Sequence, residues 1–248
     1  MNNNFIYILC LAFLGSVVGL VGGIVLLLKG KISQESSLHL ISFAAGVMLS
    51  AAFLDLLPEA VNEGGEEIFL LSLIGMVGFF LAEDFLLHFH HHEEHSHKFK
   101  NVIPFLVLSD SVHNFIDGVA ICAAYMADAK LGLLVAIATF AHEIPQEIGD
   151  FGVLLRAGLS KIKILLVNFF SACATFLGVF LTFYLYSKTQ TFIGPLLGLA
   201  TGMFIYIASA DILPELVRAE KRDIRWHTAG FFTLGILLIF FLTKFVPD

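Results

Sequence analysis

Long apolar runs alternate with short polar segments along the whole chain, and this pattern predicts membrane-spanning helices. A helix needs about 20 apolar residues to cross the hydrocarbon core of a bilayer. Runs of that length lie at 5–28, 38–60, 68–88, 101–125, 131–155, 162–186, 191–216 and 227–245. We therefore predict an all-α membrane protein with eight transmembrane helices, in a single polytopic domain over residues 1–248.

The composition agrees with this interpretation. Hydrophobic residues make up 58% of the chain and charged residues 14%, whereas soluble domains carry about 25% charged residues. The mean hydropathy is +0.88. There is no basic tract of the kind that binds nucleic acid, and we expect no nucleic-acid partner. Cys10, Cys122 and Cys173 lie in apolar runs without metal-ligand spacing, so we interpret them as buried apolar residues.

Lysine and arginine are distributed unevenly between the two sets of connecting loops. One set holds 11 of them, and the opposite set, with the termini, holds only Lys130, Lys188 and Lys244. The positive-inside rule places the basic set in the cytosol. We expect both termini outside the cell membrane, and the short loops favour a bacterial inner membrane.

Two connecting loops have compositions that favour metal cations. The outer loop after the second span is acidic, which raises the local concentration of cations. The cytosolic loop over 88–100 is rich in histidine, and such tracts indicate metal binding. A disordered polar loop is the alternative. Its histidines are His88, His90, His91, His92, His95 and His97.

A repeat relates the second span to the seventh. The segment around Asp55 and Glu59 aligns without gaps with the segment around Asp211 and Glu215, at an offset of 156 residues (55 to 211). The predicted topology makes these spans antiparallel, and inverted repeats are typical of secondary transporters. We predict a 3+2+3 arrangement: helices 1–3 at 5–88, central helices 4–5 at 101–155, and inverted helices 6–8 at 162–245.

The repeated Asp-x-x-Pro-Glu element suggests matching carboxylates at the two ends of a transport path. Under this hypothesis Asp55 and Glu59 lie at the entrance, and Asp211 and Glu215 lie at the exit. Ordinary helix-end chemistry, with proline and glutamate at a span boundary, is the alternative.

The two central spans carry polar stripes at helical spacing. Asp110 lies on one helical face with His113, Asn114 and Asp117, at offsets of 3, 4 and 7. Polar and ionisable groups at membrane depth are costly and usually mark an ion path. Imidazole mixed with carboxylate is a ligand set for zinc(II) or iron(II). The second stripe consists of His142, Glu143, Gln146, Glu147 and Asp150.

Two other functions remain as alternatives. His142-Glu143-Ile-Pro-Gln146 begins like the zinc protease motif His-Glu-x-x-His, which favours an intramembrane zinc-dependent hydrolase, but Gln146 replaces the second histidine. A regulatory metal sensor without flux is the other alternative. A transport site needs a labile, oxygen-rich shell because the ion must leave, and we therefore predict a transporter and no enzyme.

At these residues the chain resembles the ZIP family of divalent metal transporters. The matching motifs are His113-Asn114-Phe-Ile-Asp117-Gly118 and His142-Glu143-Ile-Pro-Gln146-Glu147-Ile-Gly-Asp150. The resemblance implies import of zinc(II), with iron(II), manganese(II) or cadmium(II) as other substrates, elevator-like alternating access, and a homodimer in the lipid bilayer.

The resemblance also implies a two-metal site between helices four and five. We expect His113, Asp117 and Gln146 to hold the first ion, and we expect Asn114, His142 and Glu143 to hold a neighbouring one or to pass the ion on. Glu147 is a further metal candidate. The chain departs from the family pattern at two positions, since Gln146 stands in place of a histidine and Thr175 stands where other members have a carboxylate. The sequence leaves metal preference and the number of bound ions open.

Overall fold

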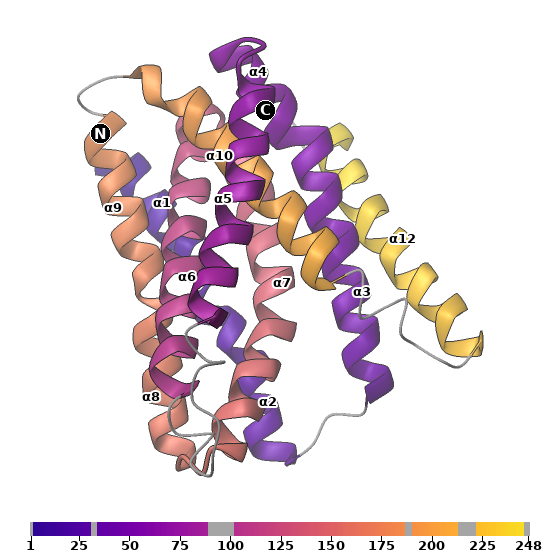
Figure 1. The fold of residues 1–248 in the computed structure, drawn as a ribbon. Coiled ribbons are helices and arrows are strands. Elements are labelled where there is room, and N and C mark those ends of the chain that lie inside the picture. The colour runs from indigo at the N-terminus through magenta and orange to yellow at the C-terminus, as the bar shows by residue number, and fades with distance from the viewer. Residues whose placement is uncertain (1, 31–33, 89–101, 187–189, 213–221, 246–248) are drawn as a thin grey trace.

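The computed structural model describes residues 2–30, 34–88, 102–186, 190–212 and 222–245, and within these ranges every regular element is a helix. The bundle is shown in Figure 1. Its elements are α1 (Asn2–Gly15), η1 (Val17–Leu20), α2 (Val21–Lys29), α3 (Gln34–Ala51), η2 (Ala52–Leu56), α4 (Leu57–Gly64), α5 (Ile68–His88), α6 (Val102–Ala127), α7 (Ala129–Arg156), α8 (Lys161–Ala172), α9 (Ala174–Tyr186), η3 (Gln190–Phe192), α10 (Ile193–Tyr206), η4 (Ile207–Ile212) and α12 (Arg222–Phe245).

Six helical stretches in the described residues are long and apolar enough to cross a membrane. The other two ranges predicted as spans are helical as well, as α5 and α7. Helix α7 has 28 residues and carries one of the two polar stripes, which lowers its hydropathy. The six stretches are Asn4–Lys29, Leu38–Gly64, Leu106–Ala127, Lys161–Tyr186, Ile193–Ala210 and Trp226–Lys244.

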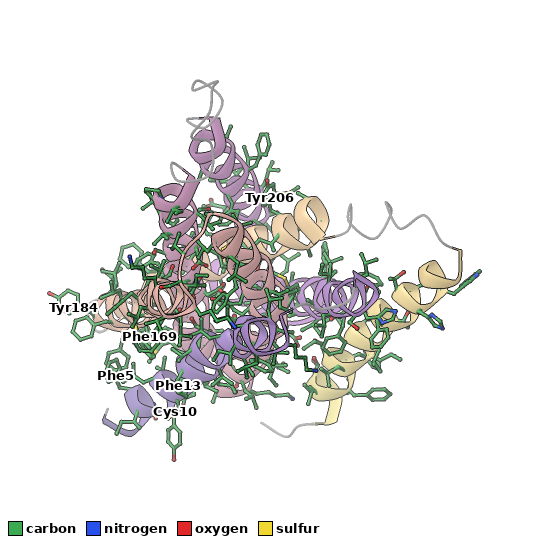
Figure 2. All side chains as sticks on the ribbon, turned by 90° about the horizontal axis from the view of Figure 1, so that it is seen from below. Phe5, Cys10, Phe13, Phe169, Tyr184 and Tyr206 are labelled. Atoms are coloured by element: carbon green, nitrogen blue, oxygen red, sulfur yellow. The ribbon has the colours of Figure 1, made fainter. Side chains whose placement is uncertain are left out.

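The outer surface of the bundle is apolar, as expected for a protein surrounded by lipid. Figure 2 shows Phe13, Phe169 and Tyr184 pointing away from the bundle, and all three are exposed. The start of α1 and the end of α12 lie at the same end of the molecule in Figure 1. An even number of crossings would produce this arrangement.

Helices α3 and α12 pack with their backbones in contact through two glycines. A Cβ atom added to Gly46 of α3 would collide with the carbonyl oxygen of Phe232 in α12, and one added to Gly235 would collide with that of Phe43. Small residues permit this close approach between membrane helices. The two helices therefore form one tightly packed pair.

Helices α5 and α10 are packed by a second copy of the same contact. A Cβ atom on Gly202 of α10 would meet the carbonyl oxygen of Ser72, and one on Gly75 of α5 would meet that of Leu199. These positions match the first pair at constant offsets, 156 residues from α3 to α10 (46 to 202) and 160 residues from α5 to α12 (75 to 235). The likeness between the second and seventh spans thus extends to backbone contacts.

Both copies also contain a π-helical turn at the repeated aspartate. The π-helix η2 contains Asp55 and ends shortly before Pro58, and η4 contains Asp211 and ends shortly before Pro214 in the sequence. Proline cannot donate a backbone hydrogen bond to the preceding turn, so the helix widens there. Such π-turns are frequent at functional sites.

We expect Gly46→Ala to destabilise the protein by about 1–3 kcal/mol, the usual cost of forcing an atom into a packed interface. Thermal unfolding in detergent would measure this as a lower melting temperature. Gly230→Ala is the matched control, since a Cβ atom at Gly230 of α12 meets nothing within 4 Å. Equal melting temperatures for the two variants would contradict the close approach of α3 and α12.

Candidate metal-binding site

Helices α6 and α7 are antiparallel neighbours joined by a single residue, Asp128. The Asp128 side chain caps α7 by accepting a hydrogen bond from the backbone N–H of Leu131 at 2.9 Å. This tight turn fixes the two helices side by side. Their polar stripes consequently face each other across the middle of the pair.

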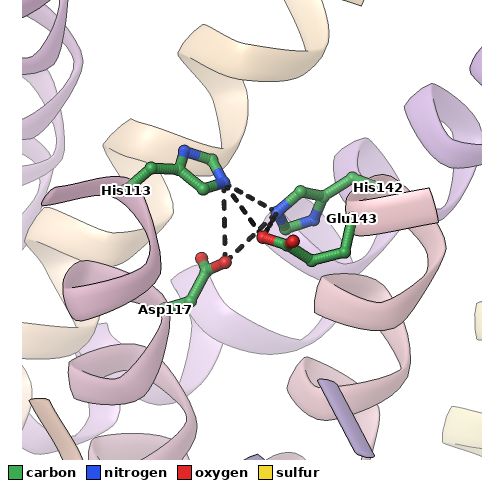
Figure 3. A group of neighbouring side chains, drawn as sticks. All are labelled: His113, Asp117, His142 and Glu143. Carbon is green, nitrogen blue, oxygen red and sulfur yellow. Dashed lines mark hydrogen bonds and ion pairs between the residues drawn. The ribbon is translucent and has the colours of Figure 1, made fainter. Parts of the chain in front are cut away.

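Four side chains from these stripes converge (Figure 3). His113 and Asp117 come from α6, and His142 and Glu143 come from α7. All four are buried, and one ligand atom from each lies within 4.8 Å of the others. The sequence predicted these residues as metal candidates, and the fold brings them together.

Several distances between these ligand atoms are close to those around a tetrahedral ion. The two imidazole Nε2 atoms are 3.0 Å apart, and His142 Nε2 lies 3.3 Å from Asp117 Oδ2. His113 Nε2 lies 3.5 Å from Asp117 Oδ2 and 3.7 Å from Glu143 Oε1. Zinc bonds of about 2.0–2.2 Å place neighbouring tetrahedral ligands roughly 3.3–3.6 Å apart. Small side-chain shifts would complete that geometry.

The His142 ring is held in the orientation that a ligand needs. Its Nδ1 atom lies 3.0 Å from the carbonyl oxygen of Ala138, one turn earlier in α7. With Nδ1 donating its proton to this carbonyl, the Nε2 lone pair faces His113 and Asp117. Hydrogen bonds of this kind select the tautomer of metal-binding histidines.

Gly19 in the first span leaves space for the Glu143 side chain. An added Cβ atom at Gly19 would lie 2.6 Å from the Cβ atom of Glu143, so a larger residue would displace the carboxylate. Gly19 lies in η1, between α1 and α2, where the helix is locally tightened. The small residues of the first span therefore act as packing partners of α7.

The two carboxylates at the site lack protein donors. Among the described residues, none donates a hydrogen bond to either oxygen of Asp117 or of Glu143. Both side chains are 0% exposed. Burial of charged carboxylates without a compensating partner is costly. A divalent cation among the four side chains would balance both negative charges.

Aromatic rings from the α5–α10 pair cover one side of the site. Phe79 of α5 packs near-perpendicular to His113, with ring centroids 6.0 Å apart, and Phe204 of α10 packs likewise against His142 at 5.9 Å. These rings keep that side of the site apolar. The tightly packed α5–α10 pair thus contacts the central helices directly at the ligands.

The two side-chain amides of the stripes bond to a third carboxylate, Asp110. Asn114 and Gln146 both donate side-chain hydrogen bonds to Asp110 Oδ1, at 3.0 and 3.2 Å. Glu147 is fully buried on α7, one turn beyond Glu143. The structure therefore places the two histidines with Asp117 and Glu143, and the two amides with Asp110.

Sequence reasoning missed Ser16, which contacts the stripe from the first span. Its hydroxyl donates to Asn114 Oδ1 at 2.6 Å, and Thr175 donates to the same oxygen at 3.1 Å. The available signal was slight: Ser16 is a hydroxyl residue within a long apolar run. Its contact with α6 depends on tertiary packing and could not be predicted from that run.

The structure describes some of the other candidates. Asp55 is buried and accepts a hydrogen bond from Thr243 at 2.8 Å, and Glu59 accepts one from Asn62 at 3.2 Å. The backbone of Asp211 belongs to η4, but its side chain lies outside the described residues, as does the side chain of His88. Also outside the described residues are Glu215, His90, His91, His92, His95 and His97.

Comparison with known proteins gives relatives of one kind. Human zinc transporter ZIP4 is 39% identical over 140 residues, which are 55% of this chain and 21% of that protein. The metal cation symporter ZIP14 of Xenopus tropicalis is 42% identical over 118 residues, 48% of this chain and 25% of its own length. Zebrafish (Danio rerio) zinc transporter ZIP10 is 34% identical over 129 residues, 52% of this chain and 15% of its own length. The chain thus matches a quarter or less of each of these relatives.

A protein-family model matches much more of the chain. The model described as ZIP zinc transporter aligns with residues 5–104 and 92–243. The two segments together include α6 and α7 and the four converging side chains. Because this match extends over nearly all of the sequence, the chain belongs to the ZIP zinc transporter family.

Proposed function

We propose that this protein imports divalent metal cations, with zinc(II) as the main substrate, and that His113, Asp117, His142 and Glu143 bind the ion during transport. The observation that carries the proposal is the convergence of two imidazoles and two unpartnered carboxylates between α6 and α7. Borderline ions prefer this mixture of ligands, so iron(II), manganese(II) and cadmium(II) are secondary substrates. The family and the names of the relatives support transport and give no support to the hydrolase alternative.

The proposed architecture is the eight-helix 3+2+3 inverted repeat, in one membrane domain over residues 1–248. Support comes from the duplicated glycine contacts and from the two π-turns at equivalent positions. In this arrangement the α6–α7 pair lies between the two repeats, where secondary transporters bind their substrates. The same two-fold relation would allow the site to face each side of the membrane in turn.

The proposed setting is a cell membrane, with the basic loops in the cytosol and both termini outside. A bacterial inner membrane and a homodimer within the lipid bilayer remain parts of this proposal. The acidic segment around Glu59 would then face the exterior and attract cations. The histidine-rich loop at 88–100 would receive ions in the cytosol.

We expect His113→Ala to lower radiolabelled zinc uptake into proteoliposomes at least 10-fold, because the ion loses an imidazole ligand at a buried site. Thr233→Ala is the control, since Thr233 is exposed on α12 and bonds only within its own helix in the described contacts. Unchanged uptake by a folded His113→Ala protein would refute the assigned site.

We expect Asp55→Asn to reduce uptake roughly 10-fold at low external zinc, because a focusing charge is lost. The asparagine can still accept the Thr243 hydrogen bond, so the fold should persist. Asp211→Asn should slow release to the cytosolic side instead, as single-turnover flux measurements would show. Normal flux in both variants would leave the repeated aspartates with a purely structural role.

Topology can be tested with single cysteines at exposed positions. In a background without Cys10, Cys122 and Cys173, we expect Glu66→Cys to react with an impermeant maleimide on intact cells. Ser160→Cys should react only after the membrane is permeabilised, because the basic loops face the cytosol. Both parent residues are exposed in the structure. The reverse pattern of labelling would invert the proposed orientation.

A further inference from the structure

The amide of Asn114 is fully engaged in protein hydrogen bonds. Its oxygen accepts from the hydroxyls of Ser16 and Thr175, at 2.6 and 3.1 Å. Its nitrogen donates to the backbone oxygen and to the Oδ1 atom of Asp110, at 3.1 and 3.0 Å. An amide oxygen with two hydrogen-bond donors has no lone pair left for a metal ion. Asn114 therefore positions other side chains and is a poor ligand.

The Asp110 carboxylate is oriented by two amides. Its Oδ1 atom accepts from Asn114 and from Gln146 of α7, the latter at 3.2 Å. Its Oδ2 atom is buried and has no hydrogen-bond partner among the described residues. The Ser171 hydroxyl lies 2.9 Å from Ser111 Oγ and is also near enough to the Asp110 carboxylate to interact with it. One oxygen of Asp110 is thus fixed by donors while the other stays available to a cation.

Glu147 supplies a second carboxylate on the same side of the four-ligand site as Asp110. The residue is 0% exposed, and among the described residues none donates a hydrogen bond to either of its oxygens. It lies close enough to Asp110 and to Asp150 for their negative charges to repel. Several carboxylates held together in a buried space without donors are strongly destabilising unless a cation or protons balance them.

Asp110 and Glu147 are displaced from the four-ligand site in the same direction. Asp110 precedes His113 on α6, and Glu147 follows Glu143 by four residues on the antiparallel α7. One helical turn corresponds to about 5.4 Å along the axis. The proposed orientation places this direction toward the cytosol. The two carboxylates thus lie at the next level along the ion's route.

We propose that Asp110 Oδ2 and Glu147 form a second divalent-cation subsite, one turn toward the cytosol from the four-ligand site. This inference rests on the proposed transport function, and it places the second ion at Asp110 and Glu147 instead of at Asn114, His142 and Glu143. Carboxylates without imidazole bind borderline metals less tightly than the mixed site does. The second subsite therefore takes the ion from the histidines and releases it readily.

Zinc stoichiometry of the purified protein tests this subsite. The parent protein for this experiment is a variant in which serine replaces the six loop histidines. Zinc bound by the loop then does not add to the measured stoichiometry. Equilibrium dialysis against zinc chloride with elemental analysis should give two ions per chain, the second binding at least 10-fold more weakly. Asp110→Asn with Glu147→Gln should keep the tight ion and lose the weak one. Asparagine at 110 can still accept the bonds from Asn114 and Gln146.

Two comparison variants make the result specific. Asp128→Asn is the matched control, because it makes the same chemical change at the capping residue of α7 and should keep both ions. His113→Ala with His142→Ala should lose the tight ion and keep the weak one. If the double carboxamide variant does not fold, judged by its melting temperature, Glu147→Gln alone replaces it and should weaken the second ion at least 10-fold.

The possible results separate the two proposals. A parent protein with one tight ion, and a carboxamide variant with the same stoichiometry and affinity, would overturn the second subsite while leaving the four-ligand site intact. The second subsite would also be overturned if the carboxamide variant lost the tightly bound ion while Asp128→Asn kept it, because Asp110 and Glu147 would then belong to the tight site. A parent protein that binds no zinc would instead refute the proposed function.

Discussion

The constraint on which the rest of this structure depends is that carboxylates buried at membrane depth need a compensating positive charge. Asp117 and Glu143 are fully buried, and their nearest ionisable partners at the site are the two imidazoles of His113 and His142. Neutral imidazole offers a lone pair and no positive charge, so it does not compensate the carboxylates. A divalent ion at the proposed site would compensate them and would use the same lone pairs. The polar stripes are therefore compatible with an apolar bundle when an ion is bound.

Close helix packing and local breaks make room for such a site. Gly19 lets the first span approach Glu143 in η1, and Gly118 of α6 lies against the backbone of Thr175 in α9. The break between α8 and α9 falls at Cys173, beside the Ala172 carbonyl oxygen, which lies 3.2 Å from Ser16 Oγ. Irregular backbone at membrane depth is tolerated where protein surrounds it. The first and sixth spans thus contribute polar groups to the central helices without exposing backbone to lipid.

Much of the helix layout could be predicted from the sequence, because hydropathy and helical periodicity are local properties. The apolar runs correspond to helices, and the offsets of 3, 4 and 7 placed His113, Asn114 and Asp117 on one face of α6. Periodicity does not determine how α6 and α7 are rotated about their axes relative to each other. That rotation decides which polar residues converge, and it placed His142 and Glu143 with His113 while leaving Gln146 with Asp110.

The contacts that distant segments make with the central helices could not be predicted either, because local sequence patterns do not determine tertiary packing. Ser16 lies 98 positions from Asn114 in the sequence, yet its hydroxyl takes one lone pair of that amide oxygen. The repeat was visible as matching letters around Asp55 and Asp211, but the duplicated glycine contacts follow only from packing. Local patterns thus identify candidate chemistry, and tertiary contacts decide which groups are ligands and which position them.

The family resemblance leads us to expect a carboxylate at position 175, and the threonine found there has a consequence that follows from hydrogen-bond capacity. A carboxylate at that position would accept hydrogen bonds and could not donate one to Asn114, whereas the threonine hydroxyl donates at 3.1 Å. This donation, together with that of Ser16, removes the amide oxygen from the set of available ligands. In the proposed second subsite, the negative charges lie one turn further along, at Asp110 and Glu147. Substitution of one acceptor by a donor can therefore move an ion position without altering the helices that carry it.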